Sequence, residues 1–153
     1  MPSRRLGSKS SLSCVVLFSA VVSFSAPTRA QSGGPGIMIL KITGFHSEKG
    51  QVRIAVFNSS ETWLGEQPVY SSTIKVDSQS VVWNITDVPY GDYGVAAFHD
   101  ENSNGKMDKN LLGIPKERYG FSNNVRATFG PPKWEKGKFA VRNPTTEISI
   151  EVK

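Results

Sequence analysis

Oxygen-bearing side chains alternate along one short string, Asp100-Glu101-Asn102-Ser103-Asn104-Gly105-Lys106-Met107-Asp108, called the acidic string below. Calcium prefers several hard oxygen ligands, and a D-x-[DN]-x-[DN]-G loop supplies them by curling the chain around the ion. Over the first nine positions of such a loop, the ligands are four side chains and the carbonyl oxygen at the seventh position. These would be Asp100, Asn102, Asn104, Asp108 and the carbonyl of Lys106. The acidic string therefore predicts a Ca²⁺ site.

The same string also fits a turn without a metal ion. The twelfth position of a calcium loop usually holds a bidentate Glu, but this sequence has Leu111 there. Asn, Asp and Gly also build tight turns that are closed by their own hydrogen bonds. An ion held by this string would bind weakly, with a dissociation constant of about 10⁻⁴–10⁻³ M. Both interpretations stay open at this point.

A second set of candidate residues mixes cations with aromatic rings over residues 116–134. Aromatic faces can stack on a sugar ring, and neighbouring cations attract anionic groups. Such rings more often pin a loop to the domain while the charged ends stay in water. The residues predicted to contact a ligand are His99, Glu117, Arg118, Tyr119, Phe121, Asn123 and Trp134.

The sequence gives little support for catalysis, and no residue is assigned a catalytic role. Its two histidines, His46 and His99, lie far apart in the chain, and no G-x-S-x-G turn is present. A zinc site needs three or four ligands, so two distant histidines with borrowed carboxylates are a weak basis for one. The alternative function is a small secreted hydrolase that uses carboxylates near His99 and Asp100.

Residues 1–30 have the features of a secretory signal peptide. Arg4, Arg5 and Lys9 precede an apolar stretch over residues 12–24, and Thr28-Arg29-Ala30 offers small residues before a cut at Gln31. The apolar stretch is shorter than the roughly 20 residues that span a bilayer. We therefore expect a periplasmic or secreted protein, with no membrane span once the signal is removed.

Removal of this leader changes the bulk properties of the chain. It contains the only cysteine, Cys14, so the mature part would have neither a disulfide nor a thiolate ligand. It also contains four basic residues, which leaves 14 basic and 13 acidic side chains in residues 31–153. This near balance gives no reason to expect nucleic acid. The predicted partner is a cell-surface glycan or another exported protein.

Period-two patterns of apolar residues recur along residues 31–153, a length typical of a single domain. The predicted strands cover residues 36–43, 52–56, 73–76, 81–86, 93–99 and 148–152, with a short seventh at 139–141. Trp83 is expected in the core. This pattern predicts an all-β fold, an antiparallel two-sheet β-sandwich of the immunoglobulin or transthyretin type.

Two segments do not read as strands. Residues 58–71 are expected to form a loop with one helical turn after Ser60. Residues 99–137 form a far longer connection, and connections beyond about 15 residues are usually functional or disordered. We expect an ordered loop that packs its own apolar side chains. Those side chains are Leu111, Leu112, Ile114, Tyr119, Phe121, Phe129 and Trp134.

Three strings, RIAVFNSSETW, VPYGDYGVAAFHDENSNGKMDKNLLGIPKERYGFSNN and GPPKWEKGKF, resemble a bacterial family catalogued as domain of unknown function 2141. The resemblance covers nearly all of residues 37–152. It implies export and a β-sandwich, and it brings no assigned reaction. The stretch 87–95 also resembles the proline-glycine corner of transthyretin-like and collagen-adhesin sandwiches, which act mostly as stalks, carriers or adhesion modules.

Overall fold

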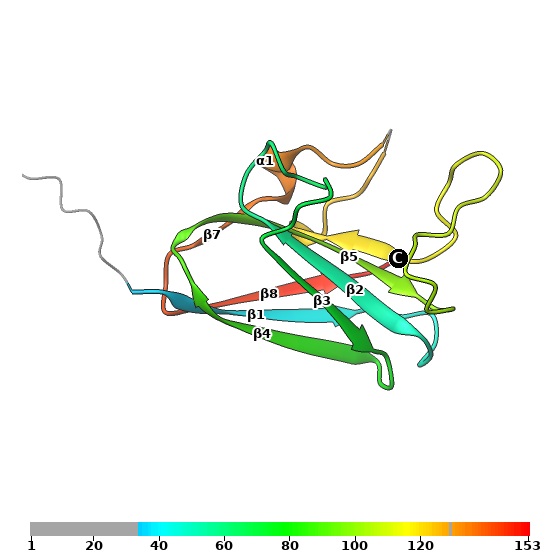
Figure 1. Ribbon diagram of the computed structural model, residues 1–153, viewed down its shortest axis with the longest axis horizontal. Helices are drawn as coiled ribbons and strands as arrows, with labels where there is room; N and C mark the ends of the chain where they lie inside the picture. The colour runs from blue at the N-terminus through cyan, green and yellow to red at the C-terminus, as the bar shows by residue number, and fades with distance from the viewer. Residues whose placement is uncertain (1–33, 129) are drawn as a thin grey trace, which may run out of the picture. The chain divides into compact units, whose positions relative to one another are not determined.

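Strands are the main regular secondary structure of the computed structural model, which describes residues 34–128 and 130–153 (Figure 1). The predicted signal peptide and Phe129 lie outside the described residues. The strands are β1 (Gly36–Thr43), β2 (Gln51–Phe57), β3 (Tyr70–Lys75), β4 (Ser80–Val88), β5 (Gly91–Asp100), β6 (Tyr119–Phe121), β7 (Phe139–Val141) and β8 (Thr145–Glu151). A 3-10 turn, η1 (Ser122–Asn124), and one short helix, α1 (Trp134–Gly137), complete the described elements. Within these residues no helix has both the length and the apolar character needed to cross a bilayer.

The strands form because alternate side chains are apolar and face a common core. In β1 every second residue, from Met38 to Leu40 and Ile42, is fully buried. β2 repeats this pattern with Val52, Ile54 and Val56. All seven predicted runs are strands, with ends that differ by a few residues. Trp83 is half-buried and packs against the core, as expected.

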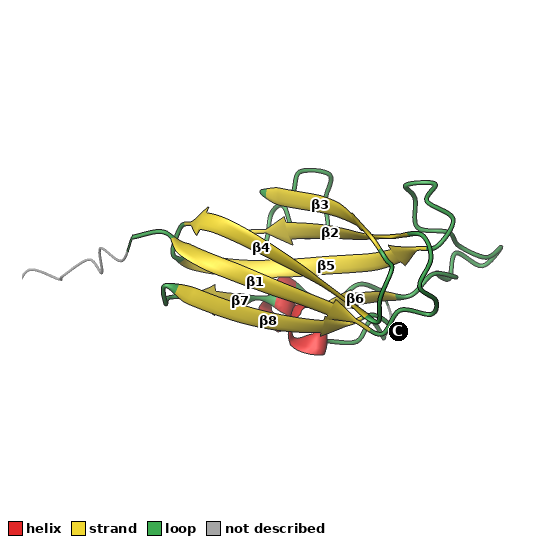
Figure 2. Ribbon diagram, turned by 90° about the horizontal axis from the view of Figure 1, so that it is seen from below, coloured by secondary structure: helices red, strands yellow, loops and turns green. Residues whose placement is uncertain are grey.

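The strands assemble into two facing sheets (Figure 2). One sheet has the order β4-β1-β8, and the other has the order β3-β2-β5-β6, with β7 also paired to β5. The core lies between them and draws on both, for example on Leu40, Val95 and Ile150. The predicted β-sandwich is therefore confirmed.

One pair of strands, β1 and β8, runs parallel, whereas the other pairs are antiparallel. The sequence pattern gave no sign of this, because apolar alternation reports which side chains face the core and not the direction of a partner strand. The first and last strands of the sandwich thus lie side by side, from Ile37 opposite Thr145 to Thr43 opposite Glu151.

The long segment 99–137 differs from the ordered loop that the sequence predicted. It contains β6, η1 and α1, and β6 is a strand of the larger sheet. Three residues are too few to show an alternating pattern, so β6 was missed. The prediction that Leu111, Leu112 and Ile114 are buried is wrong, since all three are exposed.

Candidate functional site

The acidic string begins with a carboxylate that is fully buried at the end of β5. Asp100 lies opposite Gln51 of β2, whose side-chain amide donates a hydrogen bond to Oδ2 at 2.9 Å. The backbone N–H groups of Gly105 and Asn104 donate to the same carboxylate at 2.8 and 3.0 Å. Burial alone would raise the pKa of this carboxyl. The three hydrogen bonds and the positive charge of Arg53 outweigh burial and hold the pKa below its ordinary value.

The rest of the acidic string is closed by hydrogen bonds among its own members. The side-chain amides of Asn102 and Asn104 both donate to the Asp108 carboxylate, at 2.7 and 3.1 Å. Their carbonyl oxygens accept from the backbone N–H of Asn104 and of Lys106, at 3.0 and 2.7 Å. Each side chain predicted to bind calcium therefore already accepts at least one hydrogen bond. In residues 34–128 and 130–153, no three His, Cys, Asp or Glu side chains stand ready to hold a metal ion.

Glu117 ties the acidic string to the segment that enters β6. One carboxylate oxygen accepts from the backbone N–H of Glu101 at 3.2 Å, and the other accepts from that of Asp108 at 2.9 Å. The adjacent Arg118 reaches the opposite way and donates to the backbone oxygen of Gly44 at 2.8 Å. Both residues were predicted to contact a ligand, and both hold loops together in this structure.

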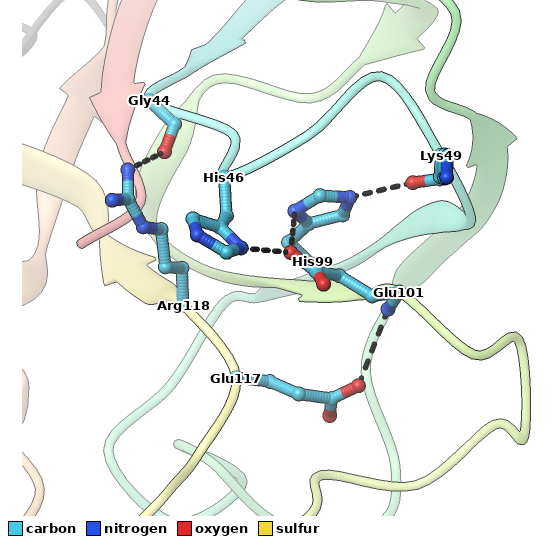
Figure 3. A network of polar contacts seen from close by, with 7 residues as sticks. All are labelled: Gly44, His46, Lys49, His99, Glu101, Glu117 and Arg118. Atoms are coloured by element: carbon cyan, nitrogen blue, oxygen red, sulfur yellow. Dashed lines mark hydrogen bonds and ion pairs between the residues drawn. The ribbon is translucent and has the colours of Figure 1, made fainter.

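The two histidines, which are distant in the sequence, meet at one carboxylate (Figure 3). His46 lies in the bend after β1, and its Nδ1 is 2.9 Å from Oε1 of Glu101. His99 lies near the end of β5, and its Nδ1 is 3.6 Å from the same oxygen. Two histidines that are far apart in the sequence therefore lie in one cluster with Glu101. Its members come from two loops and a strand, so sequence spacing carried no signal of it.

A polar pocket of about 560 Å³ opens beside this cluster. Among the described residues that line it, none is a serine, threonine, cysteine or tyrosine, so the lining provides no hydroxyl or thiol nucleophile. Charged groups of both signs surround it. The lining residues are His46, Glu101, Asn102, Asp108, Lys116, Glu117 and Arg118.

An apolar groove of about 550 Å³ crosses the outer face of the larger sheet. Strand register explains its floor, because Ala55 of β2 lies between Ser71 of β3 and Ala96 of β5. Because these side chains are small, the surface of the sheet is low along this row, which crosses three strands. The next row along the strands is taller and consists of Thr73, Arg53, Phe98 and Tyr119. The connection between β2 and β3 contributes Leu64 and Pro68 to the lining.

Aromatic rings pack together next to the floor of the groove. Trp63 contacts Phe57, Phe121 and Trp134, with ring centroids 5.5, 6.1 and 5.6 Å apart. Its indole N–H also donates to the backbone oxygen of Pro132 at 2.7 Å. The sequence singled out Trp134 as a ligand contact and overlooked Trp63. In this structure Trp134 packs on Trp63 and does not line the groove.

The other predicted ligand contacts are distributed among these places. Tyr119 and Phe121 line the apolar groove. Asn123 donates to the backbone oxygens of Lys136 and Lys138 at 3.0 and 2.8 Å, so it fixes α1 to the sandwich. The structure therefore divides the predicted set into groove residues, pocket residues and residues that support the fold.

Residues 109–115 form an exposed tip of the connection between β5 and β6, and this tip projects from the sandwich (Figure 1). The Asn110 side chain accepts from the backbone N–H of Leu112 and of Ile114, at 2.9 and 3.0 Å. A bridge between Lys109 and Pro115 closes the base. The turn is therefore ordered although its apolar side chains face water.

Comparison with known families gives one match, and it covers most of the domain. Residues 40–149 match the model of a family described as an uncharacterized protein conserved in bacteria, DUF2141. No curated protein and no solved structure matches the chain. The match spans the acidic string, both histidines, the polar pocket and the strands that form the groove. The chain belongs to the bacterial family DUF2141.

Proposed function

We propose that this protein is a binding module that holds a small ligand with an aromatic or apolar body in the apolar groove. The observation that supports the proposal is the row of small residues, Ser71, Ala55 and Ala96, that lies across three strands beside a taller aromatic row. Ligand sites are typically concave and mostly apolar, with a few placed polar groups. The groove has this character.

The polar groups of the groove define the second part of the ligand. Arg53 is half-buried and lies in the taller row next to Phe98. A guanidinium at the wall of an apolar site favours a ligand that carries a carboxylate, sulfonate or phosphate beside its ring. The proposed ligand class is therefore an aromatic or apolar anion, which includes a ring on a larger exported partner.

The probe for this proposal is 1-anilinonaphthalene-8-sulfonate, which has an aromatic body and an anionic end. Its fluorescence should rise on titration with the protein and saturate at one probe per chain. Ala96→Leu fills the floor of the groove. It should weaken binding by at least about tenfold, because the larger side chain occupies space that the ligand needs. Arg53→Gln should weaken binding by less, through loss of the charge.

Two controls separate the groove from other apolar surfaces. Val82→Leu adds bulk to an exposed residue of β4 on the other sheet and should not change binding. The double variant Leu111→Ser with Leu112→Ser replaces two exposed apolar side chains of the tip and should also bind as before. Binding that survives Ala96→Leu but disappears with the tip variant would overturn the proposal.

Calcium at the acidic string remains a prediction. Its support is the spacing of the oxygen-bearing side chains, and an ion would have to displace the two Asn amides from Asp108. With a dissociation constant of about 10⁻⁴ M, 10 mM calcium would stabilise the fold by about 2.7 kcal/mol. The melting temperature should then rise by several degrees. Magnesium should raise it by less. Asp108→Ala should abolish the rise with calcium. If calcium does not change the melting temperature, the acidic string is a turn that is closed by its own hydrogen bonds.

A small secreted hydrolase remains the alternative prediction. Asp100 is buried with its carboxylate held by three hydrogen bonds, so Glu101 is the carboxylate near His99 that reaches the polar pocket. Hydrolysis of chromogenic esters and glycosides is a direct test. Turnover that is lost in Glu101→Gln would favour the hydrolase over the binding module.

A further inference from the structure

We propose that His46, His99 and Glu101 form a binding site for one divalent transition-metal ion of the Zn²⁺ or Cu²⁺ class. This site is distinct from the apolar groove and from the predicted calcium ligands, and it does not depend on either. It rests on one buried nitrogen without a partner and on the side chains that surround that nitrogen.

The protonation pattern of His99 follows from its neighbours. Its side chain is fully buried, and Nε2 lies 2.7 Å from the backbone oxygen of Lys49. A carbonyl oxygen only accepts, so Nε2 carries the hydrogen and the neutral ring has its lone pair on Nδ1. Metal-binding histidines are commonly oriented in this way, with the second ring nitrogen donating to a backbone carbonyl.

The lone pair of His99 is directed at another acceptor. Nδ1 has no hydrogen-bond partner, although it is buried, and Oε1 of Glu101 lies 3.6 Å from it. A buried acceptor that faces another acceptor without a proton between them is unfavourable. A cation bound between Nδ1 and Oε1 gives the buried Nδ1 the partner that it lacks.

His46 supplies the second nitrogen. Its Nδ1 contacts the same oxygen at 2.9 Å, and its side chain is 67% exposed in a bend, so it can turn to make room for an ion. Ligand atoms about 2.1 Å from an ion stand about 3.0–3.4 Å apart, depending on the coordination geometry. The two nitrogen–oxygen separations, 2.9 and 3.6 Å, lie near this range. The trio is not a preformed cage, because His46 now occupies the space that the ion needs.

The donor set determines the class of ion. Two imidazole nitrogens and one carboxylate oxygen suit Zn²⁺, Cu²⁺ and Ni²⁺, whereas Ca²⁺ and Mg²⁺ prefer oxygen alone. Glu101 lines the polar pocket, so the remaining coordination positions face solvent. On binding, a neutral His46 ring carries its proton on Nε2, which leaves Nδ1 free for the ion.

The test uses the purified chain without a polyhistidine tag. Titration calorimetry with Zn²⁺ and with Cu²⁺ should show one ion per chain, unaffected by millimolar calcium. The electron paramagnetic resonance spectrum of the Cu²⁺ form should show coupling to two imidazole nitrogens. His46→Ala and Glu101→Gln should each weaken binding by at least about tenfold, as expected when a coordinating group or its support is lost.

Exposed positions provide the controls. Glu66→Gln removes an exposed carboxylate from the connection between β2 and β3 and should bind the ion as the unmodified chain does. His46 and Glu101 are exposed, so their variants should keep the unmodified far-ultraviolet spectrum, whereas the buried His99 is unsuited to a first test. The proposal is overturned if the chain binds neither ion, or if His46→Ala and Glu101→Gln both bind normally.

Discussion

The apolar groove and the polar pocket are adjacent, yet the chain builds them in different ways. The groove lies on strands, and backbone pairing fixes the relative position of its side chains. The pocket lies where loops meet, and its side chains are held by hydrogen bonds to backbone groups. One short run serves both: Glu117 and Arg118 line the pocket, and Tyr119 and Phe121 line the groove.

Because of this difference, a substitution in the groove should affect ligand binding more than stability, whereas a substitution in the pocket should also lower stability. Substitution of a groove side chain leaves the strand pairing intact, because the outward side chain takes no part in the backbone ladder. Substitution of a pocket side chain such as Glu117 or Arg118 removes a hydrogen-bond partner from backbone groups of the neighbouring loops. The variants below test this contrast, and they run from the largest expected effect on stability to the smallest.

Trp63→Ala should have the largest effect, although it lies on the groove side. The ring contacts three other aromatic rings, and its N–H bonds to Pro132. Loss of this packing should lower the free energy of unfolding by about 3 kcal/mol, measured by urea denaturation. Val69→Ala, at an exposed residue of the same connection, should change it by less than about 0.5 kcal/mol. Equal effects would contradict the assigned role of Trp63.

Asp100→Asn should lower the free energy of unfolding by about 2 kcal/mol at pH 7. The variant keeps the shape of the side chain but places an NH₂ group against donors that now bond to the carboxylate. Urea denaturation at neutral pH measures the loss. Asp92→Asn, at a carboxylate paired on the surface with Arg142, is the matched control and should cost much less.

The effect of Asp100→Asn should also depend on pH in a defined direction. The folded-state pKa of Asp100 is lowered below its unfolded value of about 3.9. The stabilisation is therefore complete above about pH 4–5 and is lost as pH falls through the folded pKa. The gap between the unmodified chain and the variant should narrow below about pH 4. A gap that stays constant from pH 7 to pH 3 would show that the charge of Asp100 contributes nothing.

Glu117→Gln should have an intermediate effect, a loss of about 1 kcal/mol. The amide oxygen of Gln can accept only one of the two N–H groups that the carboxylate now binds, those of Glu101 and Asp108. Hydrogen exchange at these two amides should accelerate, while exchange in β2 should not change. Faster exchange throughout the sandwich would show that Glu117 supports the whole fold and not the pocket alone.

Ala96→Leu should have the smallest effect on stability, within about 0.5 kcal/mol. The side chain is half-buried and lies on the floor of the groove, which has room for a larger group. Urea denaturation checks this directly. A large loss would mean that the groove is needed for packing, and it would remove the contrast between groove and pocket.

The sequence predicted most of the fold, because burial in a sandwich imposes an alternation that is visible along single strands. The runs around Val52 and Val95 are examples, and both are strands with these residues in the core. β6 was missed, since three residues are too short for the pattern to appear. Leu111 was misjudged for a related reason, because composition alone does not reveal which apolar residues stay exposed.

The sites were less predictable because their members come from distant parts of the chain. His46 and His99 meet only because the loop after β1 packs against the end of β5. The floor of the groove depends on the register that sets Ala55 opposite Ala96, which two short apolar runs do not specify. The acidic string was recognisable because its members are consecutive, although its bonding to Gln51 and Glu117 was not.

The parallel pair of β1 and β8 has a consequence for the order in which the chain folds. β1 can pair with β4 as soon as residues 36–88 are available, but its other edge stays open until Thr145–Glu151 has been synthesised. Pairings between segments so distant in sequence are slow to form, because a long loop must close first. The larger sheet can therefore assemble early, and the smaller sheet is completed last. A chain truncated before β8 would leave a strand edge that readily pairs with other molecules.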